Sequence, residues 1–375
     1  MTDRDRPRRR VAILFGGRSA EHEVSCVSAD SVIRALNPER FEAVPVGITK
    51  EGTWQLLAGP PQLEPGTGRL PAITARSGER VELARESGET ALVHQDGSEE
   101  PIDVVFPMLH GPYGEDGTVQ GMLELANIPY VGAGVLASAV GMDKAVQKVL
   151  FAAAGLPLVP HVVIHEREWE EDPEAVEARA GHLGYPLFAK PATLGSSVGV
   201  SRVSDPEELL GAIELGLRYA RKVLLERSAE GAREIECAVL GNDDPVASVP
   251  GEIIPAEGHG FYDYEAKYLD EGTRLEIPAD LELEVAEEVQ RMAVAAFLAI
   301  DAAGMARVDF FVRDREVVLN EINTIPGFTS VSMYPKLWEA SGLLYPELLE
   351  RLVELAVERH ERERKKGTAL DDLRG

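Results

Sequence analysis

Two short segments of the sequence, ARVDFF and LNEIN, carry the residue types of a metal site. Residues two apart in a strand share a face, so Arg307 pairs with Asp309 and Glu321 with Asn323. A three-residue turn at Asp314–Glu316 would set Asp309 opposite Glu321, about 5 Å apart between Cβ atoms. A two-residue turn would put them on opposite faces. Converging Asp, Glu and Asn oxygens are typical of Mg²⁺ bound with nucleotide phosphates, and the alternative is a solvated hairpin with an ion pair.

The segment KPATLGSSVG, Lys190 to Gly199, combines a lysine with a glycine-serine turn. Glycines let backbone N–H groups approach phosphate oxygens closely, and a lysine adds positive charge. The segment lacks the Gly-Lys-Ser/Thr ending of a Walker A motif and the spacing of a Rossmann fingerprint. The pattern therefore fits a phosphate-binding loop or a plain β-turn.

Two further segments could bind charged parts of a substrate. In TIPGFTS the Gly327 N–H could face an anionic oxygen, with hydroxyls from Thr329, Ser330 and nearby Ser332. In GGRSAEHEVS, Glu21 lies at an expected helix start, where a carboxylate either caps the helix or holds a substrate ammonium.

The segment HGPYGEDG, His110 to Gly117, follows a strand at the same end of the expected N-terminal sheet. A single histidine in a glycine turn is more often structural than catalytic. The loop GFYDYEAKY, Gly260 to Tyr268, places four aromatic residues in nine positions of a chain that is 6% aromatic. This composition favours either a lid over a ligand or a packed surface flap.

Strands and helices of the expected N-terminal sheet alternate along the chain. VAILFGG reads as a buried strand, the following helix has Ser19 as its N-cap candidate, and FEAVPVGIT and IDVVFPML read as further strands. A polar, weakly structured insert is expected at about 58–100. This β-α-β order predicts a parallel sheet with ligands at the carboxyl ends of its strands.

The rest of the chain reads as a mixture of helices and antiparallel strands. Helices are expected at about 143–154, 205–218, 280–300 and 344–362. REIECAVLG and PVASVPGEII read as antiparallel strands. The fold class is therefore α/β together with α+β.

Length and charge exclude several classes of protein. A chain of 375 residues favours two or three domains. Its net charge of −26 argues against a general binder of nucleic acid or of anionic membranes. The sequence shows no secretion signal and no uncharged stretch suited to a membrane span. Cys26 and Cys237 form no metal pattern, which favours free thiols in a reducing, cytoplasmic compartment.

Eight motifs in order resemble those of the D-alanine–D-alanine ligase family of ATP-grasp enzymes. They are GGRSAEHEVS, HGPYGEDG, MDK, KPATLGSSVG, REIECAVLG, FYDYEAKY, ARVDFF and NEINTIPGFTS, and the resemblance spans about residues 10 to 360. It implies a three-domain ATP-grasp architecture with an N-terminal parallel α/β domain. The divisions are a disordered tail at 1–10, a substrate-side domain at 11–142, a central subdomain at 143–226, a C-terminal domain at 227–362 and a flexible tail at 363–375.

The resemblance implies a nucleotide site and two Mg²⁺ ions, with Mn²⁺ as a possible substitute. The implied ATP-binding residues are Lys144, Lys190, Ser197, Glu226, Glu234, Phe261 and Lys267. Lys267 would reach the γ-phosphate, and Glu226 would lie on the adenine side. Asp309, Glu321 and Asn323 match the metal ligands. The segment from Glu226 to Glu234 is about one residue longer than the family pattern, which puts the ribose contacts in doubt.

The resemblance also implies sites for two D-alanine molecules. Glu21 matches the anchor of the first ammonium, linked to Ser196 and Tyr268, and His110 and Glu115 would line the same pocket. Further implied residues are Arg307 and Gly327 at an oxyanion site, and Ser332 and Met333 at the second D-alanine.

The implied reaction makes D-alanyl-D-alanine for peptidoglycan precursors through an acyl phosphate, in a homodimer that binds neither nucleic acid nor membrane. One rival is a D-alanine–D-lactate ligase, against which Tyr268 argues. Another is an inactive nucleotide-binding regulator, against which the intact set of Arg307, Asp309, Glu321 and Asn323 argues.

Overall fold

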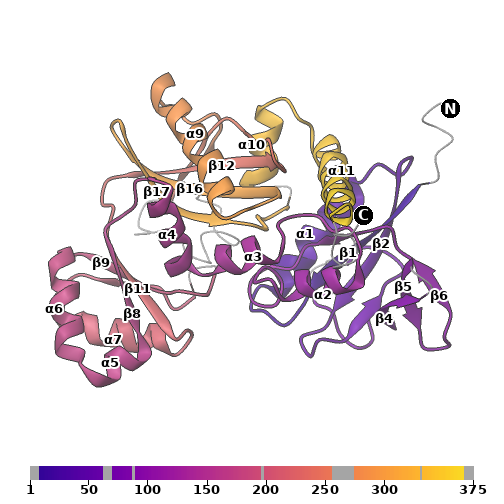
Figure 1. Cartoon of the computed structure of the whole chain (residues 1–375), viewed down its shortest axis with the longest axis horizontal. Helices are drawn as coiled ribbons and strands as arrows, with labels where there is room; N and C mark the ends of the chain where they lie inside the picture. The colour runs from indigo at the N-terminus through magenta and orange to yellow at the C-terminus, as the bar shows by residue number, and fades with distance from the viewer. Residues whose placement is uncertain are drawn as a thin grey trace, which may run out of the picture.

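The computed structural model describes residues 8–61, 70–86, 89–195, 198–255, 274–329 and 332–366. These residues form three β-sheets with helices packed on them (Figure 1). The mixed α/β and α+β class predicted from the sequence is confirmed. Among the helices in these ranges, none combines the length and the apolar character that crossing a membrane requires.

The N-terminal sheet is built on three parallel strands. Its order is β6-β5-β4-β3-β2-β1-β7, and β1 (Arg9–Gly16) pairs in parallel with β2 (Phe41–Ile48) and β7 (Val104–Pro107). Helix α1 (His22–Ala35) connects β1 to β2, as the sequence predicted. Because β1 begins at Arg9, the last residues of the expected tail belong to the strand instead.

The predicted helix cap at Ser19 is wrong. Helix α1 begins three residues later, with Glu21 at the N-cap position and no side-chain cap. The Ser19 hydroxyl instead accepts a hydrogen bond from the Glu21 N–H at 3.1 Å. Ser19 therefore shapes the turn that presents Glu21.

The predicted weakly structured insert at 58–100 is wrong for its described part, which extends the sheet with antiparallel strands. Strand β3 (Trp54–Leu56) precedes the insert, and β4 (Glu79–Glu86), β5 (Glu89–His94) and β6 (Glu99–Pro101) lie within it or at its end. Val81 and Leu92 are buried although polar residues surround them. Strand β6 returns to the start of β1, where the Arg10 guanidinium donates to the Pro101 carbonyl at 2.9 Å. Val81 is the buried residue of β4, and β5 adds only Thr90, Ala91 and Leu92, so the apolar pattern was too short to read from the sequence.

The second sheet is small and antiparallel, with the order β10-β9-β11-β8. Its strands are β8 (His161–His165), β9 (Leu187–Pro191), β10 (Ser201–Val203) and β11 (Lys222–Arg227). Helices α5 (Glu166–Glu171), α6 (Pro173–Leu183) and α7 (Pro206–Leu217) lie beside it (Figure 1). Its buried side chains form a cluster of their own.

The third sheet has the order β15-β14-β12-β16-β17, with β13 paired to β12. The strands are β12 (Arg233–Gly241), β13 (Val246–Ala247), β14 (Gly251–Ile254), β15 (Arg274–Glu276), β16 (Gly304–Arg313) and β17 (Glu316–Asn323). The remaining helices are α2 (Thr118–Ala126), α3 (Val135–Met142), α4 (Lys144–Ala153), α9 (Leu283–Ala299), α10 (Met333–Ala340) and α11 (Tyr345–Arg364).

Packing crosses the predicted domain boundaries. Side chains of α3 and α4 share a buried cluster with α9 and the third sheet. Helix α11 packs on the N-terminal sheet, where Leu348 and Leu352 join a cluster with Ile13 and Phe15 of β1 (Figure 1). The division of the chain at 142, 226 and 362 therefore stays a prediction.

Candidate active site

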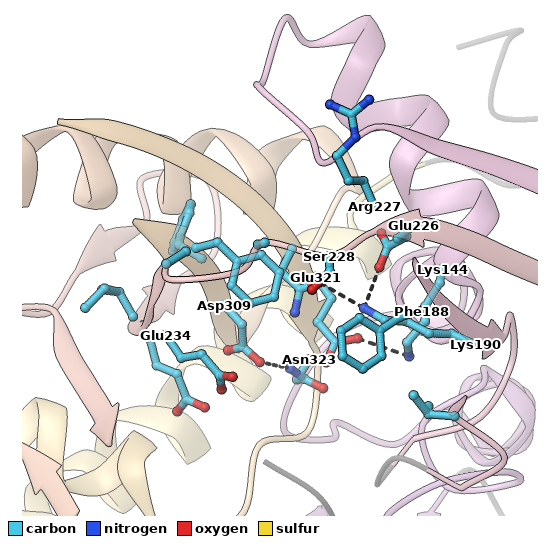
Figure 2. Close-up of a pocket in the computed structure, with 18 of the residues that line it drawn as sticks. Lys144, Phe188, Lys190, Glu226, Arg227, Ser228, Glu234, Asp309, Glu321 and Asn323 are labelled. Atoms are coloured by element: carbon cyan, nitrogen blue, oxygen red, sulfur yellow. Dashed lines mark hydrogen bonds and ion pairs between the residues drawn. The ribbon is translucent and has the colours of Figure 1, made fainter. Parts of the chain in front are cut away.

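A cavity of about 550 Å³ lies between the second and third sheets. Eight residues predicted from the sequence line it: Lys144, Lys190, Glu226, Glu234, Arg307, Asp309, Glu321 and Asn323. Figure 2 labels all of them except Arg307 and shows that the labelled side chains come from both sheets and from α4. The structure thus brings together the predicted phosphate-binding lysines and the predicted metal ligands.

The predicted pairing of Asp309 with Glu321 is confirmed, but the predicted turn is wrong. Strand register pairs Arg313 with Glu316, which leaves a two-residue turn rather than three. A β-bulge then shifts the register, so that Phe310 faces Leu319 while Asp309 faces Glu321. The extra residue is Asn320, and it returns both carboxylates to one face.

Asp309 is held by a network of charged and polar groups. The Arg307 guanidinium donates to both Asp309 oxygens at 2.7 Å and lies 3.0 Å from Glu236. Burial opposes the charge of Arg307, but Asp309 and Glu236 outweigh it and raise the pKa of Arg307 well above its usual value. The Asn323 amide donates to Asp309 at 3.0 Å.

Glu321 pairs with the first of the predicted phosphate lysines. Lys144 lies 3.1 Å from Glu321 and also donates to the Leu194 carbonyl at 3.0 Å. The described residues hold no group of three His, Cys, Asp or Glu side chains arranged around one metal position. Mg²⁺ is usually bound by one or two carboxylates together with substrate phosphates, so Asp309 and Glu321 suffice on the protein side. The donor set therefore fits Mg²⁺, with Asn323 as a third oxygen donor.

The second lysine belongs to a buried charge cluster that the sequence analysis missed in part. Glu226 pairs with Lys190 through one oxygen and with Lys148 at 2.5 Å through the other. Burial alone would raise the pKa of Glu226, but the two lysines outweigh it and lower the pKa to about 2. Lys148 lies one helical turn after Lys144 on α4, and this i, i+4 spacing was the available signal. Glu236 and Asn320 also line the cavity and were missed.

Glu21, His110 and Glu115 lie close together beside the cavity. A Cβ atom added to Gly111 would meet Glu21 Oε2 at 2.8 Å, and one added to Gly195 would meet it at 3.5 Å. The Glu21 carboxylate therefore lies between the HGPYGEDG loop and the glycine-serine segment. These two glycines leave room for it.

The groups around Glu21 have shifted pKa values. Burial, followed by the charge of Glu21, raises the pKa of Glu115 to about 8. Glu115 accepts a hydrogen bond from the Gly111 N–H at 2.8 Å. Burial lowers the pKa of His110, whose ring lies 3.2 Å from the Ser28 hydroxyl. An ammonium placed here would be attracted by Glu21 and could ionise Glu115.

The predicted oxyanion and acceptor residues lie after β17. A Cβ atom at Gly327 would meet the Ser332 hydroxyl at 3.0 Å, and that hydroxyl accepts from the Thr329 N–H at 3.0 Å. The side chain of Met333 is 5% exposed and packs in the core, and its predicted place at the second D-alanine stays a prediction. Ser196, Ser197, Phe261, Lys267 and Tyr268 lie outside the described residues, so their roles stay predictions.

Two family models together match most of the sequence. The model for the D-ala D-ala ligase N-terminus matches residues 10–133, and that for the D-ala D-ala ligase C-terminus matches residues 150–354. The chain belongs to the D-alanine–D-alanine ligase family. The resemblance inferred from the eight motifs is thereby confirmed, and with it the assignment as a ligase enzyme.

Individual members of the family are similar over nearly the whole chain. The D-alanine–D-alanine ligase of Mycolicibacterium vanbaalenii is 51% identical over 362 residues, covering 93% of this chain and 97% of that protein. The one from Thermoanaerobacter sp. is 52% identical over 362 residues, covering 94% and 98%.

Solved structures of the family share the fold. The D-alanine–D-alanine ligase from Coxiella burnetii is 38% identical, with a TM-score of 0.83 over 96% of both chains. The VanG D-Ala:D-Ser ligase from Enterococcus faecalis is 35% identical, with a TM-score of 0.79 over 93% of this chain and 100% of that one. The three-domain ATP-grasp architecture predicted from the motifs agrees with these neighbours.

Proposed function

We propose that the protein joins two D-alanine molecules to D-alanyl-D-alanine, with ATP as the energy source, for peptidoglycan precursors. The observation that carries the proposal is that a site suited to phosphates and a site suited to an ammonium lie next to each other. Lys144, Lys190, Asp309 and Glu321 line a cavity suited to Mg²⁺ and phosphates. The Glu21 carboxylate, suited to an ammonium, lies against Gly195, which lines that same cavity.

The reaction divides into two steps. The carboxylate of the first D-alanine attacks the γ-phosphorus of ATP, which gives an acyl phosphate and ADP. The amine of the second D-alanine then attacks the acyl carbon, loses a proton, and phosphate leaves.

The residues of the chain contribute binding, orientation and charge. Glu21 and Glu115 hold the first ammonium, and Lys144 and Lys190 offset charge on the phosphoryl oxygens. Arg307 and the Gly327 N–H face the oxyanion that forms at the acyl carbon, and Ser332 faces the carboxylate of the second D-alanine. Mg²⁺, bound by Asp309, Glu321 and Asn323, would add positive charge at the transferring phosphoryl group.

Several parts of the proposal rest on the motifs alone. They are the phosphate-covering serines Ser196 and Ser197, the lid residues Phe261, Lys267 and Tyr268, two Mg²⁺ ions with Mn²⁺ as a substitute, a homodimer, and a cytoplasmic location. An acyl phosphate reacts readily with water, which supports a lid over the site. The proposed use of ATP supports a cytoplasmic location, where ATP is available.

The test mixes the protein with ATP, Mg²⁺ and D-alanine, and follows phosphate release and dipeptide formation. D-alanine-dependent phosphate together with dipeptide is the expected result, and the absence of D-alanine-dependent phosphate would refute the proposal. Parallel reactions add D-lactate or D-serine as acceptor. A product formed only with D-lactate would favour the depsipeptide ligase, the second candidate.

A further inference from the structure

Lys148 occupies an unusual position for a lysine. Its side chain is 2% exposed, on the buried side of α4. The ammonium lies 2.5 Å from Glu226 of β11 and donates to the Asn320 carbonyl at 3.2 Å. Asn320 is the bulge residue of β17, so Lys148 connects three elements around the nucleotide side of the cavity.

The cluster contains two cations for one carboxylate. Lys148 pairs with one oxygen of Glu226, and Lys190 pairs with the other. Lys190 also lies 3.5 Å from the Asn320 side chain and lines the cavity, whereas Lys148 does not line it. Lys190 is therefore the member of the cluster that a ligand in the cavity can reach.

A buried carboxylate is costly when it loses its partner. If Lys190 were the sole partner of Glu226, moving its ammonium to a phosphate would leave the carboxylate uncompensated. With Lys148 in place, Glu226 stays paired while Lys190 turns to the ligand.

We propose that Lys148 is a positioning residue, the permanent counter-ion of Glu226 that frees Lys190 to bind nucleotide phosphate. The inference rests on the proposed function, because it takes the ligand of the cavity to be ATP. If Lys148 only tied α4 to the bulge, its replacement would leave the preference for a ligand with phosphates unchanged.

The test compares the affinities of two probes for each variant by calorimetry. The probes are the non-hydrolysable ATP analogue AMP-PNP with Mg²⁺, and adenosine. Contacts to the adenine are common to both probes, so the affinity ratio isolates the phosphate contacts. Wild type should prefer AMP-PNP, and the absence of that preference would contradict the proposed function itself.

Lys148→Met should lower the ratio about tenfold, because Lys190 is then held by Glu226. Lys148→Arg keeps the charge and should keep the ratio near that of wild type. The double variant Lys148→Met/Glu226→Gln removes the carboxylate that holds Lys190, so the ratio should recover.

An affinity ratio that is unchanged in Lys148→Met would overturn the proposal. The proposal would also fail if the ratio of the double variant stayed as low as that of Lys148→Met. Circular dichroism checks the fold of each variant. Should Lys148→Met not fold, Glu226→Gln alone remains informative. There the ratio should equal or exceed that of wild type, and a lower ratio would count against the proposal.

Discussion

Replacing Glu115 by Gln should make the unliganded protein more stable at neutral pH. Burial and the charge of Glu21 raise the pKa of Glu115 from 4.5 to about 8. A carboxyl group with a raised folded-state pKa contributes its full stability below pH 4.5, and loses it as the pH rises towards 8. Gln resembles the protonated acid, and its amide oxygen can keep the hydrogen bond from Gly111.

The size of the effect follows from the two pKa values. With 4.5 in the unfolded chain and about 8 in the folded one, Glu115 costs wild type up to about 3 kcal/mol at pH 7. The cost is close to zero at pH 4 and grows to about 4 kcal/mol at pH 8. The advantage of the Gln variant should follow the same curve.

Urea unfolding between pH 4 and pH 8 measures this difference. Tryptophan fluorescence serves as the signal, because Trp54, Trp169 and Trp338 lie in β3, α5 and α10. Glu21→Gln is the matched control, since removing the neighbouring charge should shrink the advantage of Glu115→Gln. Stability curves of wild type and variant that run parallel across this pH range would refute the reasoning.

Three further predictions concern the active site and the core. Glu321→Gln should lower kcat by about 10² to 10³ while circular dichroism stays unchanged, and wild-type turnover would exclude Glu321 as a metal ligand. Arg307→Lys loses the two-point contact with Asp309, so kcat in the coupled phosphate assay should fall far more than ATP affinity. Tyr334→Phe removes the donor to the Val239 carbonyl, which should cost about 1–3 kcal/mol in urea unfolding with kcat retained. Unchanged stability there would mean that the carbonyl finds another donor.

The sequence predicted the elements whose patterns are long. Three elements lie within a few residues of their expected positions: the strand VAILFGG (β1), helix α9 and the terminal helix α11. Hydrophobic periodicity over many residues is a strong local signal. Charged side chains two apart on β16 and β17 likewise placed the candidate metal ligands on one face.

Features set by tertiary packing could not be read from the sequence. The bulge at Asn320 is stabilised from outside its own hairpin, by Lys148 on the Asn320 carbonyl and by Gln147 on the Ile322 N–H. The hairpin sequence alone therefore predicted the pairing of Asp309 with Glu321 correctly, but with a three-residue turn in place of the two-residue turn and bulge. Glu226 was assigned to the adenine side, yet its two lysine partners come from α4 and β9.

The position of α11 has a consequence for synthesis on the ribosome. Leu348, Leu349, Leu352 and Val353 belong to the buried cluster on one face of β1, and they are made more than 300 positions later than β1. At about 5 to 20 residues per second, that interval is roughly 15 to 65 s. Throughout it, α1 covers part of that apolar face of the nascent sheet, and the part that α11 buries stays exposed. A chain that terminates early, just before α11, would keep that part exposed permanently and should be captured by chaperones or aggregate.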